Sequence, residues 1–164
     1  MTGFFFLSSG EPTDFCLHSR FPIWSVTGDM RYPVDVFSDG RGFFVVCRDV
    51  PEATGHDDDR CSAFEACKAS LICVFDDYFT SREAIPLPGD PGQDFIIVPS
   101  SVTSKVLLLN EVVNQHVSNS ELAKRMGLKR QEITRLFDLN HATKIDTIQK
   151  ALECLGKRLE LRAL

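Results

Sequence analysis

Four polar side chains near the C-terminus have the types and spacing needed to read a DNA major groove. They are Arg130, Gln131, Thr134 and Arg135, which follow one another at steps of one, three and one residues. On a helix this spacing places them on neighbouring parts of one surface. Arginine and glutamine form paired hydrogen bonds with base edges, and arginine also binds phosphate. The chemistry predicted for this segment is DNA recognition.

Two short amphipathic helices would position these side chains. Residues 119–136 have the pattern of two helices joined by a tight turn at Gly127, with Leu128 filling the corner between them. Apolar residues line one face of each predicted helix, namely Leu122, Met126, Ile133 and Leu136. This layout is typical of a helix-turn-helix, whose second helix enters the major groove. The alternative is a structural helical hairpin with a solvated basic face.

Further polar residues flank the predicted recognition helix. Lys129 and Lys144 are predicted to contact phosphate, and Asn140 and His141 to reach the DNA backbone. One recognition helix gives weak specificity. We therefore expect a dimer that places two such helices about 34–36 Å apart on a near-palindromic operator.

Charge divides the chain into two unlike halves. Residues 101–164 contain 11 Lys/Arg and 7 Asp/Glu, a net charge of +4. Residues 1–100 contain 7 Lys/Arg and 16 Asp/Glu, a net charge of -9. A basic C-terminal half suits DNA, and an acidic N-terminal half suits a basic protein. The alternative is that the acidic surface only keeps a small domain soluble.

The cysteines and the apolar segments indicate a cytoplasmic protein without a metal site. None of the six cysteines forms a Cys-x-x-Cys pair, which favours free, mostly buried thiols in a reducing compartment. His56 followed by residues 57–59 is more typical of an acidic loop than of metal ligands. No apolar run approaches the roughly 20 residues of a membrane span. Residues 1–29 lack a sustained period, and we expect an unstructured extension or a misassigned start ahead of Met30.

Residues 30–99 are predicted to form a β-β-β-α-β domain. Strands are expected at 31–37 and 43–47 around a turn at 38–42, at a short segment around Ala53, and at 94–98. Asp59 or Ser62 would cap the helix that runs to about Ser81. Its predicted apolar stripe is Phe64, Cys67, Leu71, Val74 and Tyr78.

Residues 100–164 are predicted to form an all-helical domain, which makes the fold class α+β. Besides the two helices at 119–136, a helix capped by Ser101 or Thr103 would run to about Gln115. Thr143 would cap a last helix over 144–155, ended by Gly156. The alternating residues 159–164 are expected to form a terminal strand that pairs with a partner chain.

Several ordered motifs resemble those of HicB-type antitoxins from bacterial HicA–HicB toxin–antitoxin systems. From Met30 to about Leu164 the chain is similar to the variant with a C-terminal helix-turn-helix. The motifs that carry the resemblance are Met30-Arg-Tyr-Pro-Val, Val50-Pro-Glu-Ala, Phe75-Asp-Asp-Tyr-Phe, Ile85-Pro-Leu-Pro, Lys129-Arg-Gln-Glu-Ile-Thr-Arg-Leu-Phe and His141-Ala-Thr-Lys-Ile-Asp. Residues 57–60 depart from the family's usual Thr/Ser-capped helix entry.

The resemblance implies a function for each half. Residues 30–99 would adopt a partial ribonuclease-H-like fold without nuclease activity and would block a HicA-like toxin, a small basic ribonuclease that cleaves mRNA. The C-terminal helices would bind operator DNA and repress the operon, in a homodimer or homotetramer, with no cofactor. Acidic residues expected to contact the toxin are Asp49, Glu52, Asp57, Asp58 and Asp59.

Two other functions are compatible with parts of the pattern. Carboxylates such as Asp35, Asp39, Asp49 and Asp76 could serve a metal-dependent nuclease, but they fall mostly at turns rather than in a converging set. We therefore do not expect an enzyme. A stand-alone repressor, whose N-terminal domain senses a ligand or only oligomerises, is the second alternative.

Overall fold

The computed structural model describes residues 30–160, and two predictions fall beyond that range. The predicted extension or misassigned start at residues 1–29 lies outside the described residues. So does most of the expected terminal strand at 159–164, of which residues 159 and 160 adopt no regular secondary structure.

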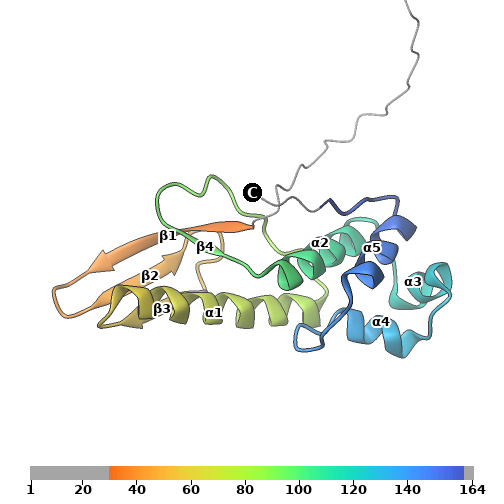
Figure 1. Ribbon diagram of the computed structural model, residues 1–164, viewed down its shortest axis with the longest axis horizontal. Helices are drawn as coiled ribbons and strands as arrows, with labels where there is room; N and C mark the ends of the chain where they lie inside the picture. Colours follow the sequence, from red (N-terminus) through yellow and green to blue (C-terminus); the bar gives the residue numbers. More distant parts are fainter. Residues whose placement is uncertain (1–29, 161–164) are drawn as a thin grey trace, which may run out of the picture.

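The N-terminal half is a four-stranded antiparallel sheet with the strand order β3-β2-β1-β4 (Figure 1). Its strands are β1 (Arg31–Ser38), β2 (Phe43–Cys47), β3 (Thr54–Asp57) and β4 (Phe95–Ile97). The predicted hairpin of β1 and β2 is confirmed. The third strand begins just after Ala53, because the Ala53 N–H donates to the Val50 carbonyl in a turn.

A side-chain cap closes the turn between β1 and β2. The Asp39 carboxylate accepts hydrogen bonds from the backbone N–H groups of Arg41 and Gly42, at 2.9 and 3.2 Å. These bonds favour the charged carboxylate and lower the pKa of Asp39. Gly40 has a φ of 81°, a conformation that glycine adopts without steric cost. The turn predicted at 38–42 thus fixes the register in which Phe37 lies opposite Phe44.

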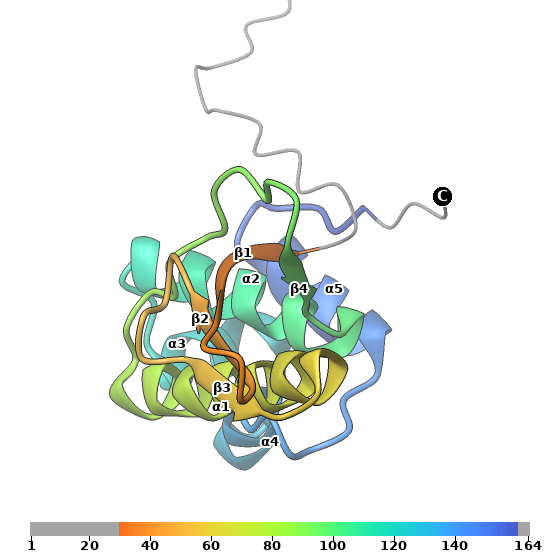
Figure 2. The ribbon, with the colours of Figure 1, turned by 90° about the vertical axis from the view of Figure 1, so that its left-hand side faces the viewer.

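Helix α1 (Arg60–Ser81) lies along one face of this sheet (Figures 1 and 2). Of the two predicted caps, Asp59 is the one observed, and its carboxylate accepts from the Ser62 N–H at 2.9 Å. Arg82 ends the helix in a left-handed conformation with a φ of 59°. Its N–H donates to the Tyr78 carbonyl.

The buried stripe of α1 differs from the predicted one. Cys67 and Leu71 are buried as expected, whereas Phe64, Val74 and Tyr78 lie at its margins and are only partly buried. The stripe follows strict four-residue steps through Ala63, Cys67, Leu71, Phe75 and Phe79. The backbone of this stripe at Ala63 and Cys67 lies so close to β3 that Gly55 has no room for a side chain.

Four helices follow the sheet, and the predicted α+β class is confirmed. They are α2 (Ser100–Asn114), α3 (Asn119–Met126), α4 (Arg130–Leu136) and α5 (Ile145–Cys154). Two predicted caps are wrong. Pro99 precedes α2 and its carbonyl accepts from the N–H groups of Val102 and Thr103, while the hydroxyl of Thr103 donates to Val98. Lys144, not Thr143, is the residue before α5.

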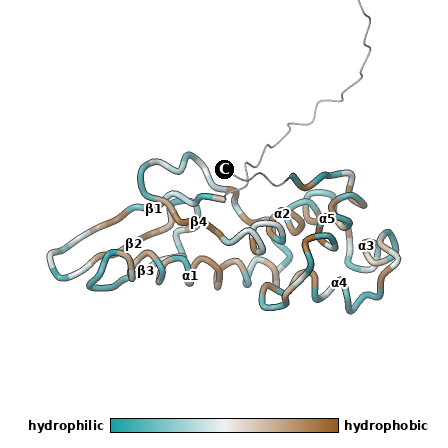
Figure 3. Tube along the Cα trace, in the orientation of Figure 1, coloured by the Kyte–Doolittle hydropathy of each residue, from teal (hydrophilic) through white to brown (hydrophobic). Residues whose placement is uncertain are grey.

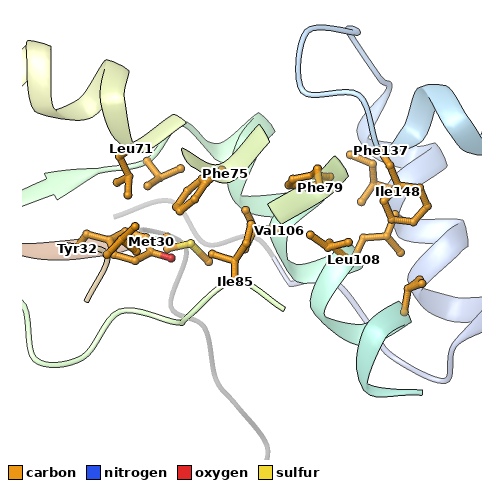
Figure 4. Packing of buried hydrophobic residues seen from close by; sticks show 14 of the residues in the cluster. Met30, Tyr32, Leu71, Phe75, Phe79, Ile85, Val106, Leu108, Phe137 and Ile148 are labelled. Atoms are coloured by element: carbon orange, nitrogen blue, oxygen red, sulfur yellow. The ribbon is translucent and has the colours of Figure 1, made fainter. Parts of the chain in front are cut away.

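One hydrophobic core runs through both halves. Phe75, Tyr32 and Met30 fill the region between the sheet and α1, and Phe79, Leu108 and Ile148 continue the core into the helices (Figure 4). Hydrophobic residues recur along α1, α2 and α5, while the loop before β4 is mostly hydrophilic (Figure 3). The predicted boundary at residues 99 and 100 therefore lies within a shared core.

The described helices and cysteines bear on two further predictions. Across residues 30–160, no helix combines the length and the apolarity that crossing a membrane requires. The five cysteines in this range are free thiols, but only Cys47 and Cys67 are buried, so the expectation of mostly buried thiols is wrong. Burial raises the pKa of Cys67 to about 11, which keeps that thiol protonated near neutral pH.

Replacing Gly55 by alanine should destabilise the protein by about 3 kcal/mol, as severe overpacking does. A β-carbon at Gly55 would lie 2.2 Å from the Ala63 carbonyl oxygen and 2.3 Å from the Cys67 nitrogen, so β3 would have to leave α1. Urea unfolding measures this change. Gly89→Ala is the matched control, because the nearest atom there lies 3.7 Å away. Equal stability of the two variants would contradict the close packing of β3 on α1.

Candidate nucleic-acid interface

Helices α3 and α4 form the predicted helical pair, and local hydrogen bonds fix each end. Ser118 caps α3 by accepting from the Glu121 N–H at 3.1 Å. Gly127 ends it with a φ of 65°, and the Leu128 N–H donates back to the Ala123 carbonyl at 2.9 Å. The tight turn predicted at Gly127 is thus confirmed. This turn sets the direction in which α4 leaves α3.

Helix α4 is anchored by its apolar face. Ile133 and Leu136 are buried, and Phe137 directly after the helix is 6% exposed. At the start of α4, the Glu132 carboxylate accepts from the Lys129 N–H at 2.9 Å, which satisfies a donor that has no partner within the helix. The opposite face is therefore held toward solvent by packing.

All seven side chains predicted to bind DNA are exposed. Four of them are carried by α4 itself, and Lys129 directly precedes it. Asn140 lies in the loop after α4, and Lys144 lies at the start of α5. The structure thus gathers the predicted set on α4 and the loop that follows it, at the end of the molecule opposite the hairpin (Figure 1). Together they are Lys129, Arg130, Gln131, Thr134, Arg135, Asn140 and Lys144.

Sequence reasoning missed Lys105, which holds the loop after α4. Its side chain comes from α2 and is only 3% exposed. The ammonium Nζ donates to the carbonyl oxygens of Asp138 and His141, at 2.5 and 2.6 Å. These bonds satisfy carbonyls just beyond the C-terminus of α4, where a cation also interacts favourably with the helix dipole. We call this arrangement the Lys105 clamp.

The sequence held a partial signal for the clamp. Lys105 precedes Leu109 by four residues and Val112 by seven, which places it on the apolar face of the predicted helix without identifying its partners. Burial lowers the pKa of Lys105, and the nearby charge of Asp138 opposes that shift. A buried ammonium is tolerated when its hydrogen bonds are made, which the two carbonyls achieve here.

The end of α1 also contacts the end of α4. The ring of Phe137 lies 6.4 Å from the ring of Phe79, centroid to centroid. The guanidinium carbon of Arg82 lies 3.9 Å from the Phe137 centroid, a cation–π arrangement. Burial lowers the pKa of Arg82. The sheet-covering helix therefore packs directly against the residue that follows the candidate recognition helix.

The acidic residues predicted to contact a toxin have different environments. Asp49 accepts from the Gly89 N–H at 3.0 Å, and Asp57 accepts from the Asp59 N–H at 3.1 Å. Hydrogen bonds from Ser62 lower the pKa of Asp59, which caps α1. Glu52 and Asp58 are exposed. Asp49 and Asp59 thus have structural roles as well, while Asp57, Asp58 and Asp59 follow one another at the end of β3.

The carboxylates considered for a nuclease lie in separate settings. Asp35 forms an ion pair with Arg48 at 2.6 Å, which lowers the pKa of Asp35, and Asp39 closes the hairpin turn. Asp76 is exposed on α1. Among residues 30–160, no three or more His, Cys, Asp or Glu side chains are grouped so as to hold a metal ion.

Replacing Lys105 by methionine should lower the free energy of unfolding by about 2–3 kcal/mol. The variant keeps most of the apolar packing but leaves two carbonyls near α4 without their charged donor. Urea unfolding gives the change, and Lys150→Met on the exposed surface of α5 is the matched control. A loss no larger than that of the control would show that the clamp contributes little.

Comparison with known proteins identifies the family to which the chain belongs. No family model matches the chain. Antitoxin HicB 1 of Photorhabdus laumondii is 48% identical over 134 residues, 81% of this chain and 86% of that protein. Antitoxin HicB of Escherichia coli K12 is 47% identical over 135 residues, which cover 80% of this chain and 98% of that protein. A third relative, Antitoxin HicB of Pseudomonas fluorescens, is 30% identical over 135 residues. With the ordered motifs and the α+β architecture, these similarities show that the chain belongs to the HicB antitoxin family.

Proposed function

We propose that this antitoxin binds and inhibits a HicA-like mRNA-cleaving ribonuclease and represses its own operon through α3 and α4. The observation that carries the proposal is the separation of two unlike surfaces. The exposed cationic side chains of α4 lie at one end of the molecule, and the sheet, whose turns and loops carry many acidic residues, lies at the other (Figure 1). One chain can then bind DNA and a basic protein at the same time.

The DNA-binding part of the proposal follows from the side chains that α4 exposes. Arg130, Gln131 and Arg135 have the donors and acceptors that read base edges, and Lys129 and Lys144 supply charge for phosphate. Packing of Ile133 and Leu136, with the Lys105 clamp behind the following loop, limits the freedom of α4 before DNA binds. Helix α4 then loses less conformational entropy when it binds DNA. Two chains would present two α4 helices to a near-palindromic operator.

The inhibitory part of the proposal requires no chemistry from the antitoxin. A protein that covers the RNA-binding surface of a ribonuclease prevents cleavage by occlusion. Acidic residues accelerate encounter with a basic partner, and apolar contacts slow dissociation. The exposed carboxylates at the end of β3 suit the first role. The relation of the sheet domain to ribonuclease-H-like folds is part of this proposal.

Replacing Arg135 by alanine should weaken operator binding about 10- to 100-fold, the loss typical of a paired contact with a base. The measurement is an electrophoretic mobility shift with the chain's own promoter DNA, alongside binding to the toxin. Binding of the toxin should not change, because α4, which carries Arg135, lies at the opposite end of the molecule from the hairpin (Figure 1).

Arg41→Ala in the hairpin turn is the matched control for DNA binding, since it removes the same charge far from α4. It should bind the operator like the unaltered protein. Full repression by the Arg135→Ala protein would refute the assignment of α4 as the reading helix.

Co-expression of this chain with a HicA-like ribonuclease should restore growth and mRNA integrity that this small basic protein alone abolishes. The reason is direct occlusion, so purified antitoxin should also inhibit RNA cleavage stoichiometrically. Growth rate and cleavage of a reporter transcript are the readouts. The Arg135→Ala variant should rescue growth equally well, which separates inhibition from repression. An antitoxin that binds its promoter but leaves the ribonuclease active would instead be a stand-alone repressor.

A further inference from the structure

Two large aromatic side chains are exposed together on the hairpin of β1 and β2. Phe37 is 57% exposed and Phe44 is 42% exposed. They are direct cross-strand partners, and their ring centroids lie 6.5 Å apart. Single exposed apolar residues are common on protein surfaces, but a paired aromatic cluster is typical of an interaction site. Tyrosine, tryptophan and phenylalanine are enriched in the centres of interfaces.

The pair belongs to the face of the sheet that α1 leaves uncovered. Because neighbouring residues on a strand point to opposite faces, Phe37 and Phe44 face away from buried Val45 and from α1. The register places His56 of β3 beside Phe44, and Val46 lies two residues further along β2 on the same face. Val46 is only partly buried. We call the surface formed by Phe37, Phe44, Val46 and His56 the hairpin patch.

The loop that returns from α1 to β4 covers a different part of the molecule. The Pro86 carbonyl accepts from the Tyr32 hydroxyl at 2.7 Å, and the Gly89 N–H donates to Asp49 at 3.0 Å. Tyr32 lies at the opposite end of β1 from Phe37. The loop is therefore held away from the hairpin turn, and Figure 1 shows the turn projecting beyond it.

Acidic residues surround the hairpin patch. Residues 35–60 contain 7 Asp/Glu and 3 Lys/Arg, a net charge of -4. Asp57 lies opposite Phe43 in the sheet register, which brings residues 57–59 to the hairpin end of the sheet. Two of the three basic residues in this range are already in ion pairs, Arg48 with Asp35 and Arg60 with Asp94. Asp57 and Asp58 are exposed at this end of the sheet, where their negative charge lies close to the patch although Asp57 follows His56 and points to the other face.

This charge argues against a second copy of the chain as the occupant. A symmetric contact would place the same acidic residues of two copies against one another, which is unfavourable. A partner with basic residues around an apolar centre would instead satisfy both the aromatic pair and the acidic rim. The combination matches the usual anatomy of an interface, with an apolar core and a polar rim.

We propose that the hairpin patch is the surface on which this antitoxin holds its toxin, with Phe37 and Phe44 as the anchoring side chains. The inference rests on the proposed function and specifies where the cationic partner binds. The two aromatic rings insert into an apolar recess of the partner, and the negative charge of Asp57 and Asp58 at the same end of the sheet attracts its basic residues. Of the predicted acidic contacts, these two therefore matter most, whereas Asp49 serves the loop and Asp59 caps α1.

The test compares toxin binding by the unaltered full chain, the double variant Phe37→Ser with Phe44→Ser, and Leu87→Ser. Leu87 is the matched control, because it is 38% exposed but lies in the loop before β4. The probe is a purified HicA-like ribonuclease, a small basic protein, and calorimetry gives the affinity. Loss of two anchors should weaken binding about 100-fold or more. Leu87→Ser should stay within about threefold of the unaltered chain, as residues outside an interface core do.

Two further measurements keep the result interpretable. Amide hydrogen exchange of the unaltered complex should slow at residues 35–46, independently of any variant. Asp57→Asn with Asp58→Asn should lower the association rate at low salt more than at high salt. Operator binding by the double variant should be normal, which shows that it folds.

The outcomes separate this inference from the function on which it rests. If the unaltered chain does not bind the small protein, both the inhibitory function and the patch assignment are wrong. If it binds and the double variant binds equally well, the toxin occupies another surface and only the patch assignment fails. If the double variant binds the toxin normally but sediments as a smaller species, the patch is a contact between copies.

Discussion

Burial of a single apolar stripe on α1 is the interaction on which the rest of the structure depends. The stripe repeats every four residues over a helix of 22 residues, longer than the sheet it covers. Its first half packs on the sheet, and its last buried residue, Phe79, contacts Phe137 after α4. Full burial of side chains of this size contributes about 1.5–3 kcal/mol each, so the stripe outweighs any single polar contact in the molecule. The same helix thereby positions both the hairpin and α4.

Within the helical half, polar side chains from α2 determine where the loops lie. The Asn110 side chain both donates to the Ile85 carbonyl and accepts from the Ile85 N–H, each at 2.8 Å. Gln115 donates to the Leu155 carbonyl after α5 at 2.7 Å. With Lys105, these residues satisfy backbone groups that a solely apolar α2 would leave without partners inside the protein. Apolar packing thus sets the arrangement of the helices, and α2 sets the conformation of the segments between them.

Local patterns predicted most of the elements, because each depends on its own neighbours in the sequence. The hairpin, its turn, α1 and the α3–α4 pair follow from strand alternation, Asp39 with Gly40, helical spacing and Gly127. Contacts made across long sequence separations could not be predicted in this way. The Lys105 clamp spans 33 and 36 residues, and the lack of a side chain at Gly55 of β3 is required by the backbone of α1 at Ala63. The caps at Ser101, Thr103 and Thr143 were wrong because Pro99 and Lys144, with no capping side chain, begin those helices. The seven side chains predicted for DNA were found exposed, whereas the exposed aromatic pair was not anticipated.

The shared core has a consequence for how such a protein can be cut or recombined. A fragment ending at residue 99 would leave Phe79 and Ile85, which are 4% and 2% exposed in the whole chain, without the helices that cover them. The fragment would expose a new apolar surface. Its self-association would then result from the truncation and would not be a property of the whole protein. Exchange of the C-terminal helices for unrelated ones would likewise require a replacement that covers the same two side chains. Point substitutions at Arg135 or Phe37 test the two proposed binding functions without exposing this part of the core.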